Sequence, residues 1–414
     1  MSKWGIGSDP SEMCMLDRFV QRLTIDNEAR SFEIETADGA VHRYPTAFAA
    51  EPEGLGLPPD FRLVSYEPAD RSLTLTPADG EPLVIELFDG GSQTDRRANR
   101  PAVYLDQNKW VLLAQAIHTP ERVPRRELPA ALELIRVAEE QRVILLLSSG
   151  HLIETARVDR HRRRDLGPLM VRLSRGWLMS DPLLVRRAEL VRMFRQRTGA
   201  SLEPAAEVIT LDLSRLYLEP TSSGPQGDPD LPEELRLLSE MMSMAAAVFA
   251  LLIEDQVTHS EEGYTMARLW AESYRSLGVE LGSNTRAREM SRDVTRAMFL
   301  SDLSHDLAEV VTASGMSARD FEIWLVDVSE DDIASLPYMG RMRDVLHLRL
   351  RNPSERWGAN DLVDMMYLPC AAAYADFVVA ENQARHHLLR AQHGRTDGAQ
   401  VMSSVAELVE RLEL

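Results

Sequence analysis

Alternating apolar and polar positions fill the first part of the chain and predict an antiparallel β-sheet. The pattern RSFEIETADG at residues 30–39 returns as RSLTLTPADG at residues 71–80, and each copy ends in an Ala-Asp-Gly turn. Residues 1–95 are therefore expected to form a small antiparallel β domain built from two copies of one meander. It holds no catalytic constellation, so we interpret it as a recognition or docking module. Its buried face is predicted to contain Ile25, Ile34, Leu73, Leu75 and Val84.

A second pattern, in which short apolar segments alternate with amphipathic ones, predicts a parallel sheet covered by helices. Residues 103–105 and 142–147 have the character of buried strands, and helical spacing is found at residues 108–118 and 127–141. The same alternation returns near the C-terminus. There we expect strands at residues 377–380 and 399–403, and helices that begin near Asn360, at residue 382 and at residue 405.

The residues between these two parts, 159–354, are almost continuously helical in pattern. The prediction is an α/β protein whose parallel-sheet core consists of residues 96–158 and 355–414, with a large helical insertion between them. Within the insertion, residues 233–257 predict a helix that is apolar on nearly all sides. We expect it to be buried against other helices or against a second subunit.

Composition narrows the class of protein. The chain has 414 residues and 44% hydrophobic residues, which is enough for two or three domains with real cores. Its two cysteines, Cys14 and Cys370, are too few for a disulfide framework or a four-cysteine zinc site. The N-terminus lacks a secretion signal pattern, and the most apolar segment, residues 241–253, is too short to cross a bilayer. A cytoplasmic protein without a membrane span is expected.

Charge is distributed unevenly along the chain. The net charge of -19 argues against a broad nucleic-acid-binding surface, because phosphate binding usually needs a basic one. Residues 151–200, however, hold 12 arginines and five acidic residues. This segment could form a local basic face, or its arginines could pair with the acidic remainder of the chain.

Acidic residues follow the predicted core strands. Asp106 comes directly after the first strand, Glu154 lies one turn inside the helix after the second, and Glu381 directly follows the strand at residues 377–380. Asp361 and Asp364 lie one turn apart at the start of a helix. Because the carboxyl ends of parallel strands face one crevice, we expect these carboxylates to converge there. Hard divalent cations such as Mg²⁺ and Mn²⁺ prefer such oxygen ligands, so the pattern predicts a metal site.

Four motifs in this order resemble those of PIN-like nucleases, specifically the larger bacterial PIN-like proteins with an LDQN-W first motif. They are YLDQNKW at residues 104–110, the glutamate in the helix after the second strand, NDxxD at 360–364 and YADFVVAEN at 374–382. The resemblance covers the two core segments, about 120 residues. It implies a PIN-like α/β/α core with a parallel sheet.

The resemblance also implies a function. PIN-like nucleases are metal-dependent phosphodiesterases, so an endonuclease that uses Mg²⁺ or Mn²⁺ on RNA or single-stranded DNA is expected. Family roles transfer to Asp106 as the central ligand and to Glu154, Asp361 and Glu381 as further ligands, with Asp364 and Asp376 as reserve candidates. Asn108 corresponds to the polar residue that hydrogen-bonds the site. Family habit suggests a role in stress response or in defence against phage.

The sequence departs from the commoner PIN pattern at three positions. Gln107 stands where small PIN domains often have threonine, and Glu381 stands where they often have aspartate, which leaves one or two metal ions open. Lys109 adds a cation that could contact the scissile phosphate or lie along the helix surface. His151 and Glu154 are spaced H-x-x-E, but the chain has no HExxH motif that would indicate zinc.

A second hypothesis comes from a different class. The PIN-like core could be a catalytically silent scaffold in which the acids only cap helices, while the β domain and the acidic surface bind a protein partner. Self-association into a homo-oligomer fits this hypothesis and the nuclease hypothesis equally. The two differ in whether Mn²⁺ binds and stabilises the protein.

Overall fold

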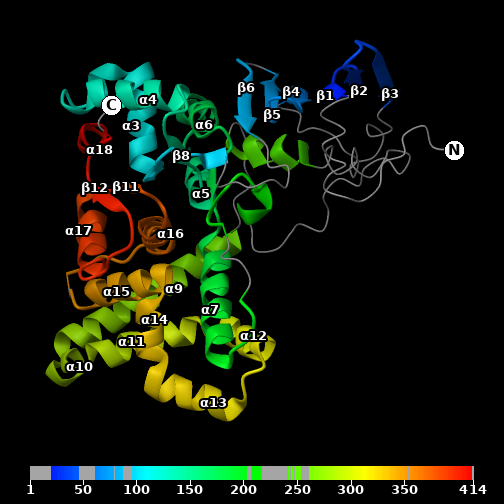
Figure 1. The fold of residues 1–414 in the computed structure, drawn as a ribbon. Helices are drawn as coiled ribbons and strands as arrows, with labels where there is room; N and C mark the ends of the chain where they lie inside the picture. The colour runs from blue at the N-terminus through cyan, green and yellow to red at the C-terminus, as the bar shows by residue number, and fades with distance from the viewer. Residues whose placement is uncertain are drawn as a thin grey trace.

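The computed structural model describes residues 20–45, 61–78, 80–86, 96–202, 207–216, 241–252 except 243 and 247, 261–352 and 354–412. These residues form a mixed α/β structure with a six-stranded antiparallel sheet, a four-stranded parallel sheet and many helices (Figure 1). No helix in these ranges is long and apolar enough to cross a membrane.

The antiparallel sheet consists of two three-stranded meanders side by side. The strands are β1 (Val20–Asp26), β2 (Ser31–Thr36), β3 (Val41–Pro45), β4 (Phe61–Glu67), β5 (Ser72–Pro77) and β6 (Leu83–Glu86). Their order is β3-β2-β1-β4-β5-β6, so the two copies of the repeat meet at β1 and β4. Arg30 and Arg71, which precede β2 and β5, both have a φ of 51°. The repeat therefore extends to its turns.

The buried face of this sheet was predicted correctly at four positions and wrongly at one. Ile25, Ile34, Leu73 and Leu75 are all buried, whereas Val84 is 36% exposed. Its neighbours Leu83 and Ile85 face the core instead. Because side chains alternate along a strand, a shift of one residue in β6 reverses which of them are buried.

The parallel sheet forms the centre of the second part of the chain. It contains β7 (Ala102–Leu105), β8 (Ile144–Leu146), β11 (Phe377–Val379) and β12 (Gln400–Met402), in the order β12-β11-β7-β8. The helical insertion was predicted without strands, and this was wrong. Leu147 bridges to Leu178 in parallel, so β9 (Leu178–Met179) follows β8, and β10 (Ile209–Thr210) pairs antiparallel with β9.

Helices cover both faces of the parallel sheet. Residues that alternate along the strands, such as Val103 and Tyr104, belong to different hydrophobic cores. Packed on one side are α3 (Gln107–His118), α4 (Glu127–Glu139), α6 (Arg160–Ser174) and α18 (Val405–Arg411). On the other are α7 (Pro182–Thr198), α16 (Asp361–Tyr374) and α17 (Asn382–Ala391). The core is thus a three-layer α/β/α arrangement.

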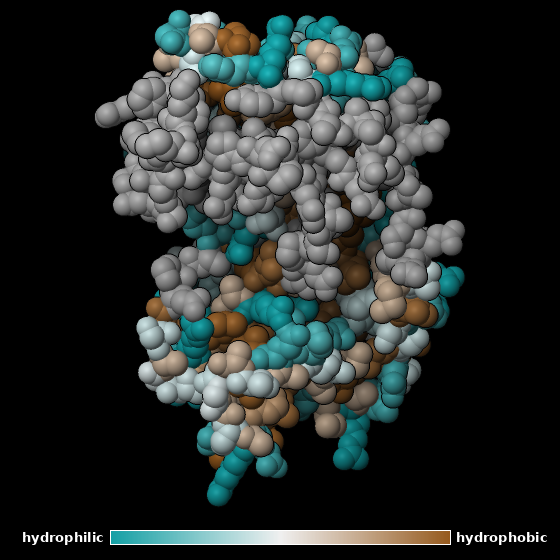
Figure 2. Space-filling view, turned by 90° about the vertical axis from the view of Figure 1, so that its right-hand side faces the viewer, coloured by the Kyte–Doolittle hydropathy of each residue, from teal (hydrophilic) through white to brown (hydrophobic). Residues whose placement is uncertain are grey.

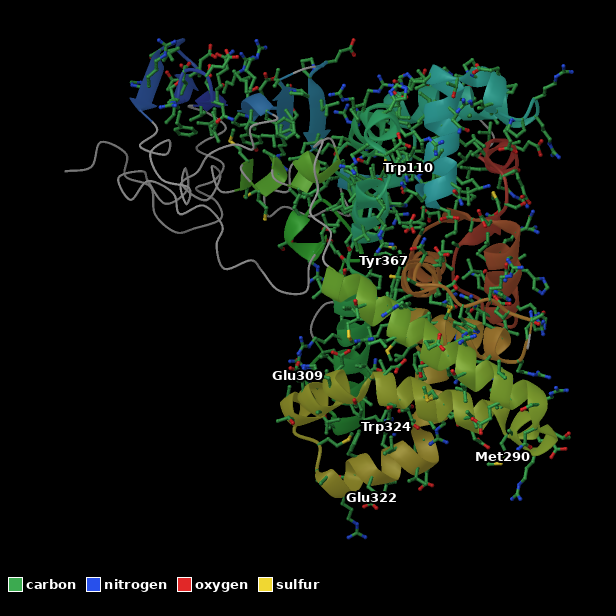
Figure 3. All side chains as sticks on the ribbon, turned by 180° about the vertical axis from the view of Figure 1, so that it is seen from behind. Trp110, Met290, Glu309, Glu322, Trp324 and Tyr367 are labelled. Carbon is green, nitrogen blue, oxygen red and sulfur yellow. The ribbon has the colours of Figure 1, made fainter. Side chains whose placement is uncertain are left out.

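The remaining helices extend from the second face of the sheet (Figure 1). Trp324 anchors this helical end, since its ring packs 4.8 Å from that of Phe194 in α7 (Figure 3). Figure 2 shows one side of this helical end, where hydrophilic residues alternate with hydrophobic patches. The helices are α9 (Glu261–Ser283), α10 (Thr285–Glu289), α11 (Ser291–Asp302), α12 (Ser304–Ser314), α13 (Ala318–Ile323), a π-helix (Trp324–Val328), α14 (Ser329–Ser335) and α15 (Pro337–Leu350). Short 3-10 helices occur at Pro120–Arg122 and Leu213–Leu216.

The helix expected at residues 233–257 is described only from residue 241 to residue 252, without 243 and 247. Met242, Phe249 and Leu252 in it are fully buried, and they pack in the same core as the β domain and α3. The expected burial is therefore confirmed for this part, and other elements of the same chain cover it.

The β domain is attached to the core through Glu86 at the end of β6. Its backbone N–H donates to the carbonyl of Arg175 at 2.8 Å, and its carboxylate accepts from the Trp177 indole at 3.2 Å and from Arg100 at 3.3 Å. Gly176 has a φ of +88°, and a Cβ there would lie 2.9 Å from the Glu86 carbonyl oxygen. Only glycine fits this close approach.

Most arginines of residues 151–200 whose side-chain partners are described bind residues of another helix, strand or loop. Arg186 and Arg187 of α7 pair with Asp306 and Glu309 of α12. Arg197 pairs with Asp332. These contacts favour the second interpretation of the basic segment, in which its arginines pair with acidic residues elsewhere in the chain.

Candidate active site

A cavity of about 910 Å³ lies at the carboxyl ends of β7 and β11. The chain order of the sheet reverses between these two strands, and such a switch point is where open parallel sheets bind ligands. All five acidic residues predicted as metal ligands line the cavity: Asp106, Glu154, Asp361, Asp364 and Glu381. They come from the end of β7, from α5 (Ser149–Ala156), from the start of α16 and from the end of β11.

Asp106 is placed by both the sheet and the helix that follows it. Its backbone N–H donates to the carbonyl of Val379 in β11 at 2.9 Å. One carboxylate oxygen accepts from the N–H of Gln107 at 2.8 Å, which makes Asp106 the N-cap of α3. The capping role uses one oxygen, so it is compatible with a second role in the cavity.

The next three residues each tie α3 to a different element around the cavity. Gln107 donates to the Thr155 hydroxyl of α5 at 3.0 Å, and both side chains are buried. Asn108 donates to the carboxylate of Glu381. Lys109 donates to the carbonyl of Ser403, after β12, at 2.7 Å. Its ammonium therefore joins α3 to the sheet and does not line the cavity.

Burial and neighbouring negative charge raise the pKa of three acids at the cavity, Asp106, Glu154 and Asp364. Burial, and then the charge of Asp106, raise the pKa of Glu154 to about 7, against the effect of Arg157. Burial, and then the charges of Asp106, Glu154 and Asp361, raise the pKa of Asp364 to about 8. Burial raises the pKa of Asp106, and Glu381 acts in the same direction. These carboxylates therefore share one electrostatic environment in which negative charge is poorly compensated.

Asp361 and Asp364 differ in their contacts. The Asp361 carboxylate accepts from the Gly358 N–H at 2.5 Å and pairs with Arg349 at 3.2 Å. Asp364 is held by no such ion pair among the described residues and lies within the field of three other acids. Asn360 stands at the N-cap position of α16, but its side chain does not cap the helix; it accepts from Arg157 at 2.7 Å.

The donor set fits a hard divalent cation, although the described residues contain no preformed group of three ligands that closes on one point. The fit follows from the chemistry of the site: partly buried carboxylates with raised pKa values lie close enough to repel one another, and a cation would relieve that repulsion. Asp106, Glu154, Asp364 and Glu381 are the residues best placed to hold it. Asp361 is already engaged by Arg349.

His151 has a structural role beneath Asp106. It is buried, and its Nε2 donates to the carbonyl of Leu105 at 2.8 Å while Nδ1 lies 3.2 Å from the Ser148 hydroxyl. Its ring stacks on Tyr104 at 4.9 Å, and burial lowers its pKa to about 4. Both ring nitrogens are thus engaged, and His151 does not act as a zinc ligand with Glu154.

A buried hydrogen-bond cluster, which the sequence did not reveal, joins the helices that carry Glu154 and Asp364. The Ser149 hydroxyl of α5 donates to Asp181 at 2.9 Å, and the Tyr367 hydroxyl of α16 also donates to it at 3.2 Å (Figure 3). Asp181 in turn caps α7 through the N–H of Leu183. Asp181 was noticeable in the sequence only as a helix break before proline.

Three arginines also line the cavity: Arg157, Arg349 and Arg356. The sequence did not single them out, because no motif surrounds them and one of them, Arg349, lies outside the predicted core segments. Asp376, the remaining acid near β11, accepts from the Ala102 N–H at 2.6 Å and pairs with Arg97. It therefore lies at the amino ends of the strands, away from the cavity.

Comparison with known protein families, with curated proteins and with solved structures gives no match to this chain. Any functional argument therefore depends on the geometry and chemistry of the cavity.

Proposed function

We propose that the chain is a PIN-like, metal-dependent nuclease that hydrolyses phosphodiester bonds in RNA or single-stranded DNA. One observation carries the proposal: carboxylates from four separate elements line one cavity at the switch point of a parallel sheet, and the pKa values of Asp106, Glu154 and Asp364 are raised. Raised pKa values from burial and like charge are typical of functional sites. The LDQN-W motif that suggested the family supplies the first of these acids.

The residues have distinct parts in this proposal. Asp106, Glu154, Asp364 and Glu381 would hold Mg²⁺ or Mn²⁺, and Asn108 orients Glu381 through its hydrogen bond. The bound ion would supply Lewis acidity and lower the pKa of a water molecule. Gln107 and Thr155 fix the distance between the helices of Asp106 and Glu154. Asp106, Glu154 and Asp364 lie partly buried in a cavity of about 910 Å³, which favours a single strand over a duplex.

Cleavage of labelled oligonucleotides tests the proposal. Wild-type protein should cut single-stranded RNA or DNA with Mn²⁺ or Mg²⁺, and EDTA should stop the reaction. Asp106→Asn keeps the helix cap and removes the charge, so cleavage should fall by about 100-fold or more while the fold remains intact. Glu322→Gln, at an exposed position of α13 far from the cavity, is the matched control (Figure 3). If Asp106→Asn cleaves at the wild-type rate, the assignment of Asp106 to the active site is refuted.

The scaffold hypothesis has its own support, because Asp106 caps α3 and Asp361 pairs with Arg349. It predicts that Mn²⁺ neither binds nor raises the melting temperature. The nuclease proposal predicts stabilisation by Mn²⁺, because the ion relieves repulsion among the acids.

A further inference from the structure

The loop between α15 and α16 forms one wall of the cavity and is held rigidly by Arg349. The Arg349 guanidinium donates to Glu355 at 3.0 Å and to the carbonyl of Arg356 at 2.8 Å. It also lies over the Trp357 ring, 4.4 Å from the ring centre. Trp357 stacks in turn on Tyr274 at 5.5 Å. The backbone on both sides of Arg356 is thus fixed by partly buried contacts.

Arg356 itself is exposed, and its side chain lines the cavity. Within the described ranges this side chain makes no hydrogen bond or ion pair, although its carbonyl oxygen binds Arg349. Arginines elsewhere in this acidic chain, such as Arg186 and Arg343, pair with carboxylates. A cation that a fixed loop holds at the cavity is therefore available to an anionic ligand.

Arg157 provides a second cation on the same cavity. It follows Glu154 by one turn of α5, and its charge lowers the pKa of that acid, so the two groups lie close together. Its Nη1 donates to the neutral Asn360 side chain at 2.7 Å, across the cavity from α5 to the start of α16. Besides Arg349, which is engaged by Glu355 and Asp361, the cavity thus holds Arg157 at the end of α5 and Arg356 in the α15–α16 loop.

We propose that Arg356 and Arg157 form a phosphate-binding rim that holds the backbone phosphates on either side of the bond to be cut. The proposal rests on the proposed function, in which a nucleic-acid strand enters the cavity. Guanidinium groups bind phosphate oxygens through paired N–H donors. Because the protein as a whole is strongly acidic and repels a polyanion, local cations at the cavity are needed to hold the strand.

Binding at several salt concentrations tests the rim separately from cleavage. Fluorescence anisotropy would follow a labelled single-stranded oligonucleotide with Mn²⁺ in the Asp106→Asn background, so that the strand is not cut. Arg356→Gln and Arg157→Gln should each weaken binding about five-fold and lower the salt slope by about 0.7, the value for one phosphate contact on a single strand. Arg351→Gln, an equal charge change at an exposed position outside the cavity, should leave the slope unchanged.

The outcomes distinguish the rim from the nuclease proposal. Equal salt slopes for the parent and both rim variants would overturn the rim. Equal losses of affinity in Arg356→Gln, Arg157→Gln and Arg351→Gln would also overturn it, because they would indicate only general charge attraction. Failure of the parent to bind any oligonucleotide would also overturn it. The cleavage assay with Asp106→Asn is independent: a strand bound by the two arginines but never cut would uphold the rim and refute the nuclease.

Discussion

Asp364→Asn is the substitution that most directly tests how the acids are arranged. Asp364 lies in the first turn of α16, where burial and the charges of Asp106, Glu154 and Asp361 raise its pKa from 3.8 to about 8. The asparagine keeps the size of the side chain and removes its charge. Without metal, the variant should therefore be more stable than the wild type, which is the reverse of what most substitutions of partly buried residues do.

The size and pH dependence of the effect follow from the pKa. A carboxyl group whose pKa rises on folding destabilises the folded protein at any pH above the pKa that it has in the unfolded chain, here near 4. The destabilisation grows as the pH rises, until it levels off above the pKa in the folded protein, here near 8. A rise from 3.8 to about 8 sets an upper bound of about 6 kcal/mol. Because coupled acids share protons and the surroundings relax, we expect about 2 kcal/mol at pH 8, or about 4 °C in melting temperature.

Thermal unfolding with EDTA and with Mn²⁺, from about pH 4 to pH 8, is the assay. Wild type and Asp364→Asn should melt together near pH 4 and diverge towards pH 8 in EDTA, and the variant should lose most of the stabilisation by Mn²⁺. Asp361→Asn is the matched control: it leaves the buried Arg349 partly unpaired, so it should lower the melting temperature and keep the Mn²⁺ effect. A destabilised Asp364→Asn with an unchanged Mn²⁺ effect would refute the reasoning.

Two further predictions concern contacts outside the acids. Because burial lowers the pKa of His151 from 6.5 to about 4, the stability of the wild type should fall as the pH drops from about 6.5 to 4. His151→Phe should make stability depend less on pH in this range. At pH 7 it should lower the stability by about 1–2 kcal/mol, because the contacts with Leu105 and Ser148 are lost. Urea unfolding at pH 7 and pH 5 measures both, and equal slopes would contradict the burial argument. Glu86→Ala should weaken the attachment of the β domain to the core, because it removes the hydrogen-bond acceptor of Trp177 and Arg100. Protease cleavage near residue 96 should therefore become faster. An unchanged rate would show that the backbone hydrogen bond to Arg175 is enough to hold the β domain.

The sequence predicted those parts of the site that depend on local order along the chain. Asp106 and Glu381 follow buried strands, and parallel strands present their ends at one edge, so their convergence could be expected. The sequence could not distinguish the role of Asp361 from that of Asp364. What distinguishes them is Arg349, which reaches Asp361 from the end of α15, and such a contact leaves no periodic signal. The two-residue strand β9 was missed for a similar reason, since its pairing with Leu147 is tertiary.

The first turn of α3 explains why so many site features were concentrated in one short motif. Asp106 bonds to β11 through its backbone, Gln107 bonds to α5, Asn108 bonds to Glu381, and Lys109 bonds to the residue after β12. Four consecutive residues thus tie the start of α3 to β11, to α5, to Glu381 and to the segment after β12. A helical turn directs successive side chains about 100° apart, so consecutive residues point to different neighbours. Gln107, which departs from the commoner threonine, is long enough to reach the Thr155 hydroxyl on α5, so this departure links the helices of Asp106 and Glu154.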